Sequence, residues 1–109
     1  MKTDKELLEL AAKAAGYNIK AHEDGTLYSD YRCSGYWGVF NPLSDDGDAF
    51  RLAVKLDMQV TVDIGGCEVW VVHNYLLSMI VESLEGVVDI YAATRRAIVR
   101  AAAAIGESK

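Results

Sequence analysis

The hydrophobic and polar residues of this chain alternate with two different periods, which predict where helices and strands lie. Thr3 and Glu6 have the spacing of a capping box, which marks a helix start, and Gly16 stands where a left-handed C-cap would end the helix. This pattern predicts a helix over residues 4–15. The apolar residues that form its buried stripe are Leu7, Leu8, Leu10, Ala11, Ala14 and Ala15.

Two further segments have the period of a helix. The acidic stretch 44–48 precedes apolar residues at helical spacing and predicts a second helix, with Ser44 or Asp45 as its N-cap. Asp89 precedes a third, which we expect Gly106 to end. Small side chains at 101–104 would let its backbone approach neighbouring elements closely. The apolar stripe of this closing helix is Tyr91, Thr94, Ala97, Ile98, Ala101, Ala102 and Ile105.

Three consecutive segments have strand character. Residues 58–63 alternate strictly, with Met58, Val60 and Val62 on the face we expect to be buried. Residues 67–73 and 75–84 are apolar on both faces. For 75–84 we favour a strand over a helix, because the turn before it is short. A separate hairpin is predicted from residues 27–33 and 36–40.

These elements indicate one domain spanning residues 1–109. The predicted fold class is α/β of the α+β type, a central antiparallel β-meander between helical layers. The expected order is helix, hairpin, helix, three strands and helix. Since the strands at 67–73 and 75–84 are apolar on both sides, helices or a second copy must cover both, and a homodimer is expected.

Composition and charge narrow the possible partners. The 109 residues include 16 acidic and 11 basic ones, a net charge of −5, which argues against nonspecific nucleic-acid binding. The first ten residues do not resemble a signal peptide, so we expect a cytoplasmic protein without a membrane segment. Cys33 and Cys67 match no metal or redox spacing and are expected to be free thiols.

Candidate catalytic and metal-binding residues are few. Asp45, Asp46 and Asp48 could bind a cation, but their spacing departs from the calcium-loop pattern, and helix capping explains them better. His22 and His73 have no neighbouring catalytic motif. We therefore predict no enzyme activity, no catalytic residue, no metal and no cofactor.

Two groups of residues are candidates for binding. Three arginines of the closing helix could grip a phosphate or carboxylate, or could pair with the protein's own carboxylates. The aromatic residues between 28 and 37 could close the core or form a contact surface. The candidate binding residues are Arg95, Arg96, Arg100, Tyr28, Tyr31, Tyr36 and Trp37.

Two runs, NPLSDDGDAFRLAVKL at 41–56 and YAATRRAIVR at 91–100, give the chain a family resemblance. It resembles the phage ABA-sandwich domain, found in small proteins of tailed bacteriophages and prophages. In that family a proline usually stands before the second run, where this chain has Ile90. The resemblance covers the three predicted helices and matches poorly at 17–40 and 74–88. It implies a sheet between helical layers and a phage origin, and it carries over no established activity.

Size, acidity and the lack of a catalytic constellation favour a protein that acts by binding. We expect the partner to be a host or phage protein in the bacterial cytoplasm, contacted through exposed aromatic residues. The alternative is a small-ligand or nucleotide-binding protein that uses the arginines of the closing helix.

Overall fold

The computed structural model describes residues 2–33, 36–73, 78–86 and 89–109. Its elements follow the predicted order, with one additional strand before the hairpin, and the mixed α/β class is confirmed. In chain order they are α1 (Asp4–Ala15), β1 (Ile19–Ala21), β2 (Leu27–Cys33), β3 (Tyr36–Val39), α2 (Asp46–Lys55), β4 (Met58–Asp63), β5 (Glu68–His73), β6 (Ser78–Ser83) and α3 (Ile90–Glu107).

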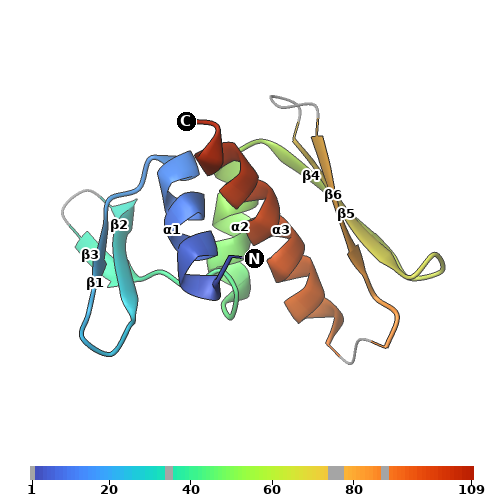
Figure 1. Ribbon diagram of the computed structural model, residues 1–109, viewed down its shortest axis with the longest axis horizontal. Helices are drawn as coiled ribbons and strands as arrows, with labels where there is room; N and C mark the ends of the chain where they lie inside the picture. Colours follow the sequence, from blue (N-terminus) through green and yellow to red (C-terminus); the bar gives the residue numbers. More distant parts are fainter. Residues whose placement is uncertain (1, 34–35, 74–77, 87–88) are drawn as a thin grey trace.

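The strands form two separate antiparallel sheets with the helices between them (Figure 1). Strands β1, β2 and β3 lie on one side of the helices, and the meander β4-β5-β6 lies on the other. Within one chain the meander therefore has helices on one face only, whereas the sequence predicted helical layers on both. The reason is that α1 packs against α3 rather than against the meander.

The register of the meander shows which side chains share a face. Val60 of β4 pairs with Val71 of β5, which pairs with Ile80 of β6. This face is turned toward α3, and Val69 and Val71 on it are completely buried. The prediction that the segment before α3 is a strand is confirmed over Ser78–Ser83.

The predicted helix starts are confirmed by their caps. The Thr3 side chain accepts a hydrogen bond from the Glu6 backbone N–H, and the Asp89 side chain accepts one from Ala92. Asp45 caps α2 in the same way. Each cap satisfies a backbone donor that the first helical turn leaves without an intrahelical partner.

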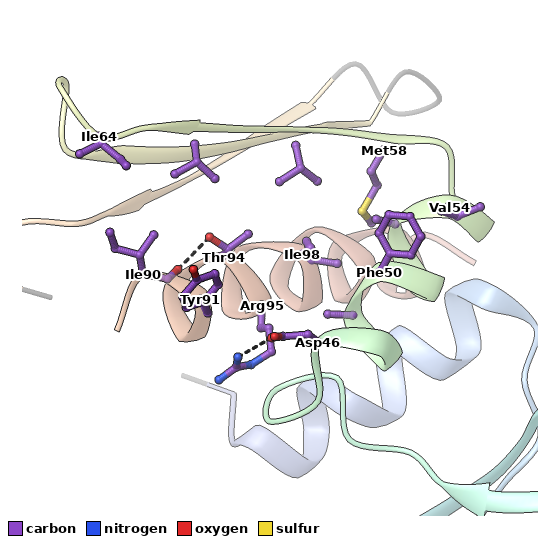
Figure 2. Close-up of a pocket in the computed structure, with 14 residues that line it drawn as sticks. Asp46, Phe50, Val54, Met58, Ile64, Ile90, Tyr91, Thr94, Arg95 and Ile98 are labelled. Carbon is purple, nitrogen blue, oxygen red and sulfur yellow. Dashed lines mark hydrogen bonds and ion pairs between the residues drawn. The ribbon is translucent and has the colours of Figure 1, made fainter. Parts of the chain in front are cut away.

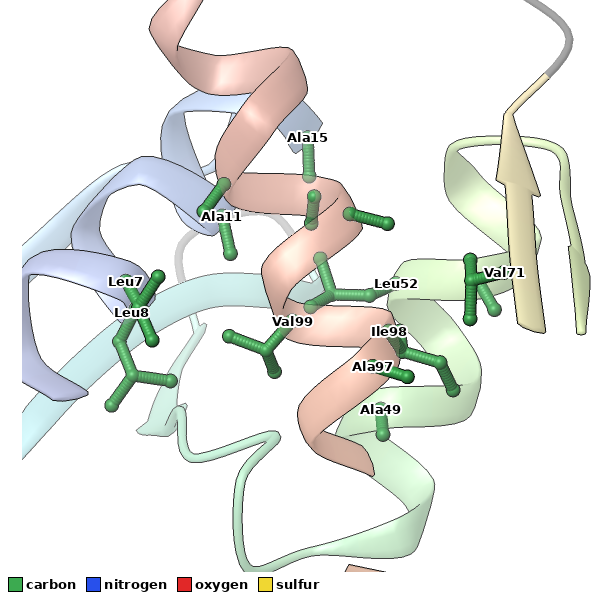
Figure 3. Close-up of a cluster of buried hydrophobic side chains, with 14 of the residues drawn as sticks. Leu7, Leu8, Ala11, Ala15, Ala49, Leu52, Val71, Ala97, Ile98 and Val99 are labelled. Atoms are coloured by element: carbon green, nitrogen blue, oxygen red, sulfur yellow. The ribbon is translucent and has the colours of Figure 1, made fainter. Parts of the chain in front are cut away.

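The core is centred on the contact between α1 and α3 (Figure 3). Ala11 of α1 and Ala97 and Ala102 of α3 are fully buried, so the two helices meet through small side chains. Gly106 was predicted to end α3, and this is wrong. It lies inside the helix, which continues to Glu107, and its lack of a side chain permits the close approach of α1.

Candidate functional site

An open apolar groove lies between β4 and the two helices α2 and α3 (Figure 2). It encloses about 680 Å³. Strand β4 and the turn after it form one wall, α3 forms the floor, and α2 forms one end. The residues that line it are Asp46, Ala49, Phe50, Ala53, Val54, Met58, Val60, Val62, Ile64, Ile90, Tyr91, Thr94, Arg95 and Ile98.

The groove exists because α3 covers β5 and β6 of the meander and leaves β4 partly uncovered. Val69 and Val71 of β5 are fully buried, but the β4 residues paired with them, Val62 and Val60, are 42% and 36% exposed. The sequence predicted that this face of β4 is buried. The structure buries it only in part, because α3 packs chiefly under β5 and β6.

Two aromatic side chains stand open at the groove. Phe50 of α2 is 69% exposed and Tyr91 of α3 is 72% exposed. Tyr91 was predicted to lie on the buried stripe of its helix, and this is wrong. Its turn of α3 faces the open groove beside β4. Val54 and Ile64 are also mostly exposed. The groove therefore presents a contiguous apolar surface, unlike the single apolar residues that are common on protein surfaces.

The single ion pair at the groove among the described residues joins α3 to the start of α2. The Arg95 guanidinium lies 2.6 Å from the Asp46 carboxylate, and its Nε donates to the Leu43 carbonyl at 2.8 Å. The Arg95 side chain is only 15% exposed. Arg95 therefore holds the loop before α2 against α3.

The other two candidate arginines lie on a different side of α3. Arg100 pairs with Glu82 of β6, and Arg96 reaches Glu82 at 3.8 Å and Asp4 at 3.4 Å. The structure does not bring the three arginines together, and each has a carboxylate partner. Of the two interpretations left open by the sequence, internal pairing is the one that this geometry favours.

The aspartates at the start of α2 have structural partners. Asp45 caps the helix, and Asp48, 3% exposed, accepts hydrogen bonds from the Asn41 backbone N–H at 2.9 Å and from Arg51 at 2.6 Å. Asp48 and Arg51, three positions apart in α2, form an ion pair. Within the described ranges, no three His, Cys, Asp or Glu side chains gather in a way that could hold a metal ion.

The aromatic candidates belong to the other sheet, away from the groove (Figure 1). The Tyr28 ring lies 4.6 Å from the His22 ring, and the Lys20 ammonium lies 4.3 Å from the centre of the Trp37 ring. Tyr28 and Trp37 are half-buried. The side chains of Tyr31 and Tyr36 lie outside the described part of the chain.

The histidines and the described cysteine do not form a cluster. His22 lies beside β1 in the first sheet, whereas His73 is buried at the end of β5. Cys67 is an exposed free thiol in the turn before β5. Among the described residues, these positions bring no candidate nucleophile next to a candidate general base.

Comparison of the chain with known protein families, curated proteins and solved structures finds no match. In the described segments, no helix combines the length and the apolar character needed to cross a bilayer.

Sequence reasoning missed the groove, although one signal for it was present. Phe50 and Val54 stand four positions apart in α2, each followed in the sequence by a basic residue, Arg51 and Lys55. Two large apolar residues at that spacing form a second apolar stripe. The stripe indicates that α2 has a contact surface besides the one it buries in the core.

Proposed function

We propose that this protein acts by binding another protein, and that the groove between β4 and α2/α3 is its contact surface. The observation that carries the proposal is the exposure of six large apolar side chains along one depression. These residues are Phe50, Val54, Val60, Val62, Ile64 and Tyr91.

The composition of the groove supports a protein partner. Buried aromatic anchors surrounded by smaller apolar contacts account for most of the binding energy in protein interfaces. A standard interface buries roughly 800 Å² on each partner. Phe50 and Tyr91 are each about seven-tenths exposed, and an aromatic side chain can bury roughly 150–250 Å². Together with the exposed valines and Ile64, they supply a large part of such an area.

The resemblance of residues 41–56 and 91–100 to the phage ABA-sandwich domain suggests where the partner is found. On that basis we propose a host or phage protein in the cytoplasm of an infected bacterium. Both runs contribute to the groove, the first through Phe50 and Val54 and the second through Tyr91.

A homodimer remains part of the proposal, through the meander face opposite the helices. Trp70 and Val72 on this face are half-buried, and Val81 is 39% exposed. Trp70 pairs across to Val81, so these side chains are neighbours on one face. A second copy of the meander face would cover them.

Matched variants separate these two surfaces. Val54→Asp places a charge in the groove, and Val81→Asp places the same charge on the opposite face of the meander. We expect Val54→Asp to abolish binding of the protein partner captured by the wild type from phage-infected cells, and Val81→Asp to preserve it. Light scattering should show loss of the dimer in Val81→Asp alone. A partner bound equally by both variants would contradict the groove as the contact surface, and a monomeric wild type would contradict the dimer.

A further inference from the structure

The open backbone edge of β4 runs along the groove. Over the described residues β4 pairs with β5 alone, through an unbroken register from Met58–His73 to Asp63–Glu68. In an antiparallel edge strand, the N–H and C=O groups of alternate residues point away from the paired strand. The rim of the groove along β4 therefore carries backbone donors and acceptors with which another strand could pair.

Strand β4 has none of the features with which proteins usually block such an edge. Proline, lysine, bulges and inward-pointing charges are the common protections against added strands. The segment Met58–Asp63 contains no proline and no basic residue, and its register with β5 has no bulge. The one charged residue, Asp63, accepts a hydrogen bond from the Gly66 N–H in the following turn.

The side chains of β4 and the groove match the period of an added strand. Met58, Val60 and Val62 line the groove from alternate positions of β4, and Figure 2 shows Met58 pointing into it. If another strand paired with β4, every second side chain of that strand would point to the groove side of the sheet. These side chains would lie over Tyr91 and Phe50. Such a strand would fill the groove with every second residue.

The border of the groove is acidic. The aspartates that line it or adjoin a lining residue in the sequence are Asp45, Asp46, Asp48, Asp57, Asp63 and Asp89, against the basic residues Arg51, Lys55, Arg95 and Arg96. Arg95 is paired with Asp46, and Lys55, which follows Val54, is an exposed cation. The excess of negative charge around the groove, together with the net charge of −5, favours a partner with basic residues.

We propose that the groove binds its partner by strand addition: an extended segment of the partner adds to β4 as a fourth strand of the meander. This inference rests on the proposed function. The segment's alternate residues are apolar and enter the groove, and the residues between or beside them are basic. Main-chain hydrogen bonds to β4 contribute affinity, and the groove selects the side chains. A second copy is the less suitable occupant, because pairing two β4 strands with Val60 opposite Val60 would set Asp57 opposite Asp63.

The test uses synthetic peptides with the 109-residue chain, and fluorescence anisotropy is the readout. The probe is a nine-residue peptide with valine at odd positions and with lysine or threonine at even positions. One control has glutamate in place of lysine, and another has the same composition with its valines at helical spacing. We expect the alternating basic peptide to bind, the two controls to bind at least about tenfold more weakly, and added salt to weaken the binding.

Two methylated peptides test the backbone pairing. One carries N-methyl groups on the amides of its odd residues, and the other on those of its even residues. Because only one set of amides can face β4, one pattern should abolish binding and the other should preserve it. Equal binding by the two patterns would overturn the added strand.

Two protein variants test the groove side of β4. Val62→Asp and Thr61→Asp add the same charge at neighbouring positions, but Val62 lines the groove and Thr61 points to the opposite face. Both charges attract a basic peptide, so weaker binding by Val62→Asp would come from the lost apolar contact. We expect about a tenfold loss for Val62→Asp and no loss for Thr61→Asp, with unchanged circular dichroism in both.

The remaining outcomes separate this inference from the proposed function. If the groove binds a natural partner but only the helical-spacing peptide competes for it, the added strand is wrong and the binding function stands. If the wild type forms a dimer that Val62→Asp dissociates, the occupant is a second copy and the basic segment is wrong. If the Val54→Asp variant binds the natural partner as well as the wild type does, the proposed function itself fails.

Discussion

Gly106 of α3 lies so close to Leu10 of α1 that a Cβ atom added to Gly106 would be 2.9 Å from the Leu10 carbonyl carbon. Gly106→Ala should therefore push the two helices apart. We expect the free energy of unfolding to fall by about 1–3 kcal/mol, although the same change at an open helix position would raise it by about 1 kcal/mol. Urea denaturation followed by circular dichroism measures the difference.

The control for this prediction is Ala104→Gly, on a half-exposed side of the same helix. Helix propensity alone should lower its stability by about 1 kcal/mol. If Gly106→Ala proves more stable than the wild type, the close contact between α1 and α3 is wrong.

Asp48 should contribute more to stability than its neighbour Asp46. Removing the Asp48 side chain leaves the Asn41 N–H without its acceptor and removes a partner of Arg51. We expect Asp48→Ala to lower the free energy of unfolding by about 1–3 kcal/mol. Asp46→Ala removes an ion pair whose carboxylate is 73% exposed and should cost less than about 1 kcal/mol. Equal losses in urea titrations would contradict the structural role of Asp48.

Asp30 should titrate at a low pH because Asn18 binds its carboxylate. The Asn18 side-chain amide donates to Asp30 at 2.8 Å and its backbone N–H at 3.1 Å, and these bonds hold the pKa of Asp30 below its usual value. A lowered pKa in the folded state means that the stabilisation is present at neutral pH and is lost as the pH falls through that lowered pKa.

Asn18→Ala should raise the pKa of Asp30 toward its usual value, measured by carboxyl carbon NMR. Asp24 is the internal reference, because its pKa is lowered by hydrogen bonds from Thr26, which the variant leaves in place. An unchanged titration of Asp30 would show that the Asn18 side chain is not the cause.

The paired arginines should give the protein no phosphate site. Arg96 and Arg100 share Glu82, so a phosphate would have to displace a carboxylate from both. We expect millimolar inorganic phosphate and nucleotides to leave the melting temperature unchanged. A rise that Arg100→Ala removes and Lys13→Ala preserves would instead support the alternative small-ligand function.

The fold was predictable where local chemistry determines it. Thr3, Asp45 and Asp89 each bind the backbone three residues later, so helix starts follow from residues close in sequence. Strict alternation over 58–63 likewise identified β4. Such short-range patterns also gave the order of the elements.

The layers and the groove were not predictable because they depend on contacts distant in sequence. Gly106 resembles a C-cap until Leu10, far away in the chain, is placed against it. Alternation predicts an apolar face for Val60 and Val62, but only the position of α3 decides whether that face is covered. Tyr91 fits a buried stripe by its spacing and is exposed because nothing in the described part of the chain covers that side of α3.

The central claim is that the apolar residues between β4 and α2/α3 form an open surface that a partner covers. The most direct measurement is methyl NMR with a soluble paramagnetic probe, before and after adding the alternating basic peptide. We predict that the methyl signals of Val54, Val62 and Ile64 are broadened in the free protein and protected in the complex, while those of Val39, 48% exposed on β3 of the other sheet, stay broadened in both. Groove methyl groups that are already protected in the free monomer, or that stay broadened when the peptide binds, would contradict the account.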